Sequence, residues 1–227
     1  ACVELMPHSS GLQRNIVQCL DDFGIPLYLS HTVTNIVGRD RVEKIVIQKV
    51  DENRTPIPGT EITFECDTLL LSVGLIPENE LSKQAGICLN PRTGGPEVYE
   101  NMETTIPGVF ACGNVLHVHD LVDYVTKEAQ RAGQSAAAYL LGNKLPDVVA
   151  YRIEAADDVT YTVPSKLHRD LTDKTVSVFF RVRRVFGKSR IVVSDGEAEL
   201  CSFPRIHMAP GEMERIEVPT ALLASAK

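Results

Sequence analysis

The pattern of apolar and polar positions predicts a mixed α/β arrangement in roughly the first 145 residues. Apolar residues recur at helical spacing over residues 12–23, and residues 1–6 and 25–37 on either side of this helix have the pattern of extended strands. Gly24 follows the helix at the position where a glycine commonly ends one. Because a helical crossover brings the second strand back in the same direction, this order predicts a parallel pair of strands.

The following segments predict a β-meander and then two buried strands that each end on a glycine. Residues 42–50 and 61–66 have strand patterns and are joined by a loop rich in turn-forming residues. Residues 67–74 are almost continuously apolar, which is typical of a strand buried on both faces, and residues 109–112 form a second such run. The first run stops at Gly74 and the second at Gly113, where a backbone can approach a ligand closely.

Two helices and an all-β region complete the predicted order of elements. A short helix is expected over residues 79–85, and a long alanine-rich helix over residues 121–141. Beyond Pro146 the pattern changes to short strands separated by Gly, Pro and Asp turns, which predicts an all-β module of sandwich or barrel-like form over residues 146–227. The strands expected in this module cover residues 159–163, 175–185, 190–193, 199–203 and 215–218.

Composition and charge narrow the classes of function. The chain has 227 residues, of which 44% are hydrophobic and 23% charged, as expected of a folded globular protein. A formal net charge of −7 with scattered basic residues argues against a nucleic-acid partner, and no apolar run approaches the roughly 18 residues of a membrane span. The six cysteines are widely spaced with no C-x-x-C pair, which argues against a disulfide framework or a zinc ribbon and indicates a reducing, cytoplasmic location.

Two segments resemble motifs of a known enzyme family. Residues 104–115 (TTIPGVFACGNV) are similar to the second flavin-contacting motif, T-x-x-P-G-V-F-A-x-G-D, of the FAD-dependent pyridine-nucleotide oxidoreductases, the flavoproteins with two dinucleotide-binding domains. Residues 67–79 (DTLLLSVGLIPEN) are similar to the strand that leaves the nicotinamide domain in the same family. Within that family the chain most resembles the flavoproteins related to anaerobic glycerol-3-phosphate dehydrogenase.

The resemblance implies an α/β fold with partial Rossmann-like domains, truncated at the N-terminus. Residues 1–75 would be the later part of the NAD(P)-binding domain, residues 76–145 the returning part of the FAD-binding domain, and residues 146–227 a small all-β module. Neither domain's G-x-G-x-x-G loop occurs in the chain, so we expect this polypeptide to be a fragment that alone binds neither dinucleotide tightly.

The resemblance also implies the cofactors, FAD and NAD, and the residues that contact them. Gly113 and Asn114 would face the ribityl chain of FAD, with Asn114 replacing the family's Asp by an uncharged side chain, and the backbone amides of Lys127, Glu128 and Ala129 would meet the flavin pyrimidine edge. Val73 and Gly74 would lie where the nicotinamide domain ends. Glu4, at the end of a strand, would bind a ribose hydroxyl and favour NAD over NADP, unless it is a solvated strand-end residue.

The function that follows is part of an FAD-dependent oxidoreductase that passes hydride or electrons between NAD(H), flavin and a second substrate. The alternative is a non-catalytic fragment or subunit that acts as a binding or structural module, because both glycine loops are absent. The expected partners are a small-molecule substrate or an electron acceptor, and a second copy or a companion subunit. The sequence identifies no catalytic residue.

A histidine pair and a cysteine beside the flavin motif have several interpretations. His117 and His119 alternate along an extended segment and could ligate a metal from one face, donate to flavin or substrate, or be buried structural residues. Because no further Cys or His nearby closes a site, we expect no metal. Cys112 is expected to be a small buried residue rather than a redox thiol.

Overall fold

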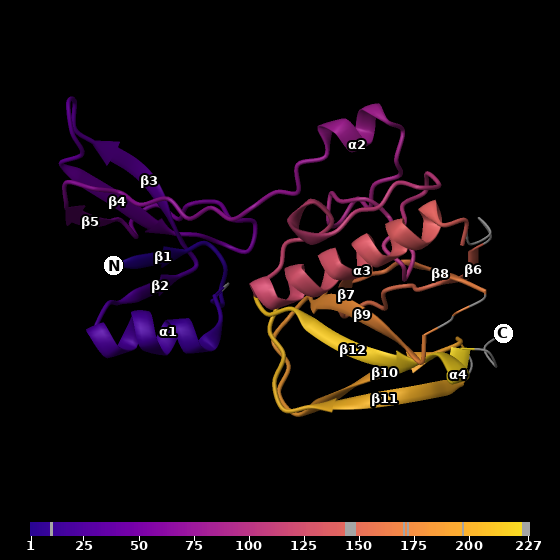
Figure 1. The fold of residues 1–227 in the computed structure, drawn as a ribbon. Coiled ribbons are helices and arrows are strands. Elements are labelled where there is room, and N and C mark those ends of the chain that lie inside the picture. Colours follow the sequence, from indigo (N-terminus) through magenta and orange to yellow (C-terminus); the bar gives the residue numbers. More distant parts are fainter. Residues whose placement is uncertain (10, 144–148, 170, 172, 197, 224–227) are drawn as a thin grey trace. The chain divides into compact units, whose positions relative to one another are not determined.

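The computed structural model describes residues 1–9, 11–143, 149–169, 171, 173–196 and 198–223. The chain divides into two units, Ala1–Gly74 and Leu75–Lys227. Figure 1 shows the order of the elements along the chain. No helix of the described residues is long and apolar enough to span a lipid bilayer.

The first unit begins with the predicted β-α-β arrangement. Strand β1 (Cys2–Glu4) pairs in parallel with β2 (Leu27–Leu29), and helix α1 (Gln13–Cys19) lies between them in the chain. A short 3₁₀ turn, η1 (Asp21–Phe23), follows the helix and ends at Gly24, whose φ of 62° is left-handed. The parallel pairing confirms the crossover predicted from the sequence.

The predicted meander forms an antiparallel sheet in the order β3-β4-β5. Its strands are β3 (His31–Val37), β4 (Lys44–Lys49) and β5 (Ile62–Glu65). Ile45 and Ile47 on β4 are buried whereas Lys44 is exposed, because successive side chains of a strand point to opposite faces.

The predicted buried strand over residues 67–74 is wrong. No described strand pairs with this segment, and the side chains of Leu70, Leu71 and Val73 are 85%, 73% and 91% exposed. An apolar run becomes a two-face-buried strand only where strands pair with its edges and other layers cover its faces. The described residues of this unit supply neither, so the run is an exposed extended segment.

The second unit contains the predicted helices. Helix α2 (Glu80–Gln84) and the 19-residue helix α3 (Val122–Leu140) agree with the predictions to within two residues at each end, and a 3₁₀ turn, η2 (Gly113–Val115), lies between them. The predicted strand over residues 109–112 is reduced to an isolated bridge between Glu103 and Phe110. This segment is held by loop hydrogen bonds instead, including Ala111 N–H to Met102 O at 3.0 Å.

The all-β region is confirmed, with strand bounds close to those predicted. Its elements are β6 (Val149–Arg152), β7 (Val159–Val163), β8 (Lys166–His168), β9 (Thr175–Val182), β10 (Ser189–Ser194), β11 (Glu199–Arg205), β12 (Glu214–Pro219) and α4 (Thr220–Leu223). Strand β9 is central to the antiparallel sheet β12-β9-β7, strands β10 and β11 form a hairpin, and β6 pairs with β8. Apolar side chains of the hairpin, including Ile191 and Phe203, pack against the core formed by β9 and β12, which gives two packed β layers.

The β region shares a core with the segment that precedes it. Val98, Leu116 and Ala132 form one buried cluster with Tyr161 and Val163 of β7. Four side-chain pairs also join the two parts: the ion pairs Glu97–Lys166, Asp120–Arg181 and Arg131–Asp173, and the hydrogen-bonded pair Glu100–His168. The boundary predicted between residues 145 and 146 falls outside the described residues, and the parts on either side of it pack as one unit.

Candidate flavin site

The predicted flavin motif folds as a tight turn at Gly113, directly before the loop that leads to α3. Gly113 is buried and has φ of 73°, a conformation that residues with a side chain rarely adopt. A Cβ added there would lie 3.3 Å from Val125 Cγ1 of α3, which is tighter than an ordinary contact. A glycine is therefore required here both by backbone conformation and by the close approach of the helix.

Asn114 is the exposed residue of this turn. Its side-chain Oδ1 accepts a hydrogen bond from the backbone N–H of His119 at 3.1 Å, which closes the loop 114–119. The amide N–H₂ group is the part of this side chain that can still donate to a ligand hydroxyl.

Helix α3 presents its first turn close after this loop in the chain. No described side chain caps the helix at Leu121, so the first backbone N–H groups, those of Val122 and Asp123, have no capping side chain. Lys127, Glu128 and Ala129 lie further along, where backbone N–H groups bond to carbonyls four residues earlier. The contact predicted between their amides and the flavin stays a prediction, and the unbonded amides of the helix lie about one turn before them.

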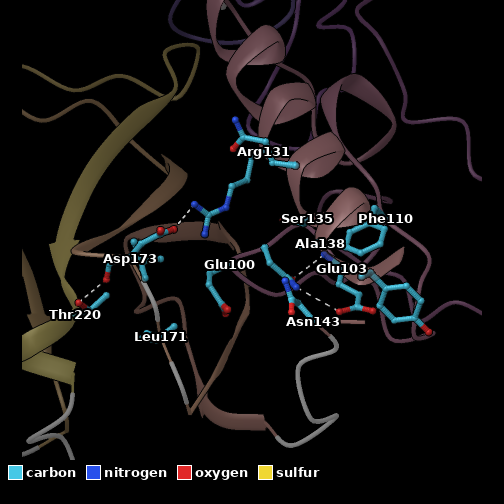
Figure 2. A pocket seen from close by; sticks show the side chains of 14 residues that line it. Glu100, Glu103, Phe110, Arg131, Ser135, Ala138, Asn143, Leu171, Asp173 and Thr220 are labelled. Carbon is cyan, nitrogen blue, oxygen red and sulfur yellow. Dashed lines mark hydrogen bonds and ion pairs between the residues drawn. The ribbon is translucent and has the colours of Figure 1, made fainter. Parts of the chain in front are cut away.

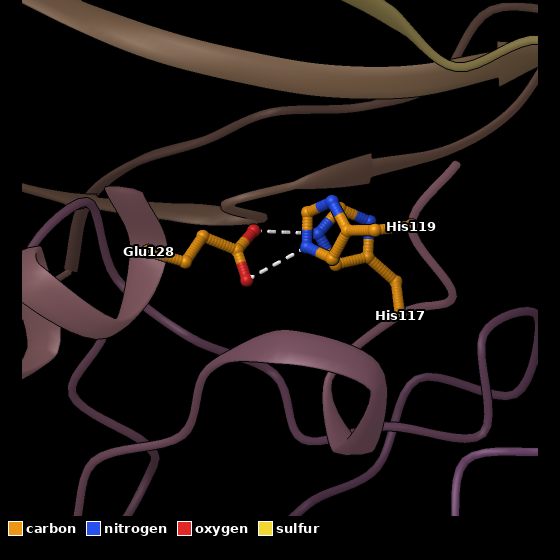
Figure 3. Close-up of side chains that lie close together, drawn as sticks. All are labelled: His117, His119 and Glu128. Atoms are coloured by element: carbon orange, nitrogen blue, oxygen red, sulfur yellow. Dashed lines mark hydrogen bonds and ion pairs between the residues drawn. The ribbon is translucent and has the colours of Figure 1, made fainter. Parts of the chain in front are cut away.

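The side chain of Glu128 points back to the turn and meets two histidines (Figure 3). One carboxylate oxygen, Oε2, accepts the backbone N–H of Gly113 at 2.8 Å, and the other, Oε1, lies 2.7 Å from His117 Nε2. His119 Nε2 lies 2.9 Å from Oε2. The three side chains are at most 2% exposed. The cluster His117–His119–Glu128 thus fastens the glycine turn to the helix from within the unit.

Burial and mutual charge shift the pKa values of this cluster. Burial alone would raise the pKa of Glu128, but the hydrogen bond with His117 and the charges of His117 and His119 outweigh it and lower the pKa to about 2. Burial lowers the pKa of His117 despite the attraction of Glu128. Burial, and then the charge of Glu128, raise the pKa of the Cys112 thiol. The arrangement therefore favours an ionised Glu128 carboxylate and a protonated Cys112 thiol, as expected of a non-redox Cys112.

The sequence did not indicate the role of the Glu128 side chain. The motif predicts a flavin contact from the backbone amide of Glu128. In the structure its carboxylate contacts His117, eleven residues away. The alternation of the two histidines was visible in the sequence, but their meeting with α3 depends on how the loop 114–121 turns. Only the folded chain brings these groups together.

Two cavities of this unit lie away from the Gly113 turn, although Phe110 of the motif lines the first of them. One, of about 390 Å³, is lined by residues of α3 and of the β region (Figure 2), and Arg131 forms an ion pair with Asp173 across it. Glu103, also in its wall, accepts the backbone N–H of Gly108 at 2.7 Å. The other, of about 620 Å³, is lined mostly by apolar side chains of the β region. Neither cavity includes Gly113, Asn114 or the cluster His117–His119–Glu128.

The remaining predicted site residues lie in the first unit. Glu4 ends β1, where a ribose-binding carboxylate was expected, and its Oε1 accepts the backbone N–H of Met6 at 2.9 Å. Val73 is exposed, and Gly74 has φ of 87° with open space around the position of a Cβ. The structure does not group these three residues into one site.

Comparison with known proteins supports the family indicated by residues 67–79 and 104–115. The family model described as pyridine nucleotide-disulphide oxidoreductase matches residues 2–136, more than half of the chain. The chain belongs to this family. The assignment confirms the family predicted from residues 67–79 and 104–115, and with it the cofactors FAD and NAD.

Curated relatives in the family match only parts of this chain. An NADH oxidase of Methanocaldococcus jannaschii is 28% identical over 123 residues, which are 54% of this chain and 24% of the relative. A 34.2 kDa protein in a rubredoxin operon of Clostridium pasteurianum is 40% identical over 83 residues, 37% of this chain and 24% of that protein. The chain thus matches about a quarter of the length of each.

A solved structure was also found by similarity of fold. It is an FAD-dependent pyridine nucleotide-disulphide oxidoreductase from Desulfovibrio vulgaris, 19% identical with a TM-score of 0.43, and the match covers 85% of this chain and 46% of that one.

Proposed function

We propose that this chain is the flavin- and nicotinamide-binding latter part of an FAD-dependent oxidoreductase, which passes hydride between NAD(H) and flavin and then electrons to or from a second substrate. When bound, FAD supplies the hydride-accepting and hydride-donating chemistry. The observation that carries the proposal is the turn at Gly113: the family's motif residues form a glycine-dependent turn followed by the uncapped N-terminus of α3.

The residues of this turn fit a flavin in three respects. The left-handed Gly113 keeps side-chain bulk away from the backbone, and the exposed amide of Asn114 can donate to a hydroxyl group. The amides at the start of α3 form the positive end of a helix dipole, which suits the polar oxygens of a flavin. In this proposal Lys127, Glu128 and Ala129 contribute by shaping the second turn of α3, and Glu128 holds the turn in place.

In the first unit, the proposal assigns nicotinamide-dinucleotide binding to the end of β1. Glu4 lies at the carboxyl end of a strand in a parallel pair, the place where such a carboxylate binds a ribose 2′-hydroxyl, which favours NAD over NADP. Val73 and Gly74 would mark the exit from this domain. Residues 1–75, 76–145 and 146–227 keep the domain roles expected from the sequence.

Several finer parts of the proposal concern the whole protein. We place the chain near the flavoproteins related to anaerobic glycerol-3-phosphate dehydrogenase and expect a preceding segment to supply the two glycine-rich loops. The electron acceptor is a small molecule or a small redox protein, and the relative in a rubredoxin operon supports the second class. The six free cysteines support a reducing, cytoplasmic compartment.

The test is an intact mass and a visible absorption spectrum of the protein isolated from its native source. A mass well above 25.0 kDa with flavin absorption near roughly 370 and 450 nm supports the proposal. A mass of 25.0 kDa without flavin would contradict it and favour a non-catalytic binding module.

Substitution of Asn114 tests the site itself in the flavin-containing protein. Asn114→Asp retains an acceptor for His119 N–H and adds the charge that the family uses, so we expect FAD to bind several times more tightly. Asn114→Ala should weaken FAD binding by about tenfold, equivalent to the loss of one hydrogen bond. Affinity is measured by fluorescence titration of the deflavinated protein, with Asn53→Ala, in an exposed turn of the first unit, as the control. Equal affinities for all variants would remove Asn114 from the site.

A further inference from the structure

The ligating atoms of His117, His119 and Glu128 converge within the second unit. One ring nitrogen of each histidine and a carboxylate oxygen lie within 4.8 Å of one another, and the two nitrogen-to-oxygen contacts measure 2.7 and 2.9 Å. Two ligands that share one zinc ion at about 2.0–2.2 Å in tetrahedral geometry stand roughly 3.3–3.6 Å apart. The two observed contacts, which involve different oxygens of the Glu128 carboxylate, are shorter than this, so small side-chain movements that separate the ligands would accommodate an ion.

The histidines carry buried nitrogen atoms without hydrogen-bond partners. Among the described residues, none forms a hydrogen bond with His117 Nδ1 or with either ring nitrogen of His119. His119 Nε2 is near Glu128 Oε2 but is not oriented for a hydrogen bond to it. Unpartnered buried nitrogen is costly, and for His119 Nε2 a shared cation would remove that cost.

Apart from the two histidines, few positive charges among the described residues reach the carboxylate of Glu128. Arg181 influences the cluster electrostatically, but its guanidinium is already paired with Asp120 at 2.5 Å. Phe179 and Tyr161 enclose the histidine rings edge-on, with ring centroids 5.8 and 5.9 Å from that of His117. A buried carboxylate in such an apolar enclosure needs a cation, either a proton on an imidazole or a metal ion.

We propose that His117, His119 and Glu128 form a binding site for one divalent transition-metal cation of the class that includes Zn²⁺ and Fe²⁺. Two imidazoles and one carboxylate suit this class, whereas Mg²⁺ and Ca²⁺ prefer sites made of oxygen atoms. Gly113 N–H, which donates to Glu128 Oε2, supports the carboxylate from outside the ligand set.

A cation at this site would join the loop 114–121 to helix α3. Two ligands come from the loop and one from the second turn of the helix, so the ion would fix the Gly113 turn against the helix. Three protein ligands leave a fourth coordination position for a water molecule. Because the ligands are nearly completely buried, the ion would act mainly by joining the loop to the helix. This inference does not depend on flavin binding, because its ligands are distinct from Asn114 and the first turn of α3.

The experiment measures metal directly in purified protein, with and without FAD. The protein is stripped with a chelator, incubated with Zn²⁺ or Co²⁺, passed through gel filtration and analysed for metal by mass spectrometry. We expect about one equivalent of bound ion, visible d–d absorption from bound Co²⁺, no retained Mg²⁺, and a rise in melting temperature of about 5–10 °C with Zn²⁺.

Two ligand variants and a matched control locate the ion. His119→Gln and Glu128→Gln should each lower the affinity for Co²⁺ at least tenfold. His168→Gln is the control, because His168 is equally buried and paired with one glutamate, Glu100 at 2.9 Å, but is not part of a three-ligand group among the described residues. It should bind Co²⁺ as the parent protein does.

Two outcomes would overturn the proposal. One is less than about 0.1 equivalent of metal in the parent protein after incubation, with an unchanged melting temperature, which would identify the cluster as a hydrogen-bonded triad. The other is equal loss of Co²⁺ in His168→Gln and His119→Gln. The first readout uses the parent protein alone, so it stands even if a ligand variant fails to fold. Metal binding in protein that holds no flavin would support this inference and not the proposed function. Flavin binding in protein that holds no metal would support the proposed function and not this inference.

Discussion

Two segments with similar sequence patterns differ in burial in this protein. Residues 67–74 and residues 109–113 are both apolar runs that end on a glycine with positive φ, Gly74 at 87° and Gly113 at 73°. In the first, the apolar side chains are exposed and the space beside the glycine is open. In the second, Ala111 and Gly113 are buried, and α3 lies against the glycine.

The difference shows that an apolar run becomes buried only where other elements pack against it. Only then does the glycine at its end make a close contact that a side chain would disturb. The run 109–113 is fixed by a helix that follows it within ten residues and by the carboxylate of Glu128 on that helix. The run 67–74 has no comparable partner among the described residues of its unit. The contrast between these two segments predicts how each responds to substitution.

The largest effect is expected from Glu128→Ala. This change leaves the Gly113 N–H and His117 without their shared acceptor and removes the carboxylate beside His119, so the free energy of unfolding should fall by about 3 kcal/mol. Urea denaturation followed by circular dichroism measures it. Glu65→Ala, which removes an exposed carboxylate paired with Lys44 in the first unit, is the control and should change stability by less than about 0.5 kcal/mol. A small effect at Glu128 would mean that the cluster does not hold the turn.

The two glycines should differ when each is replaced by alanine. Gly113→Ala adds left-handed strain and a 3.3 Å contact with Val125, and should cost about 2 kcal/mol. Gly74→Ala adds left-handed strain without a close contact and should cost about 1 kcal/mol. The same denaturation assay compares them. Equal losses would show that neighbouring packing does not distinguish the two turns.

The reactivity of cysteine thiols gives an independent comparison of burial. Burial and the charge of Glu128 raise the pKa of Cys112, so less of it is thiolate at mildly alkaline pH. At pH 8 we expect iodoacetamide to modify Cys112 several times more slowly than the exposed Cys19 and Cys88, as followed by peptide mass spectrometry. Denaturation in urea should remove the difference. Rapid modification of Cys112 in the folded protein would show that the segment 109–113 is open.

The smallest change in stability is expected from polar substitutions in the exposed run. Leu70→Ser combined with Leu71→Ser should alter the free energy of unfolding by less than about 0.5 kcal/mol, because both side chains already face solvent. The binding of a hydrophobic dye should decrease, since an exposed apolar surface is removed. A large loss of stability would show that another part of the folded protein covers these residues, and the contrast with residues 109–113 would fail.

The features predicted correctly from the sequence depend on local signals. The β-α-β crossover follows from the spacing of apolar residues and from Gly24, helix α3 from nineteen residues with strong helix formers, and the strands β7 and β9–β12 from alternation between turn residues. The flavin motif was recognisable because its residues are consecutive. The predicted strands over 67–74 and 109–112 failed because a strand forms only where a partner strand pairs with it, and for 67–74 burial is missing as well.

The sequence by itself therefore determined most of the helices and strands, the family, and the location of the glycine turn, because each depends on residues close together in the chain. Only the tertiary structure decided which apolar run is buried. It also joined Glu128 to His117 and His119, since side chains from a loop and a helix meet only when the loop has turned and the β region has closed over them. The cluster that we propose as a metal site is for that reason a property of the fold.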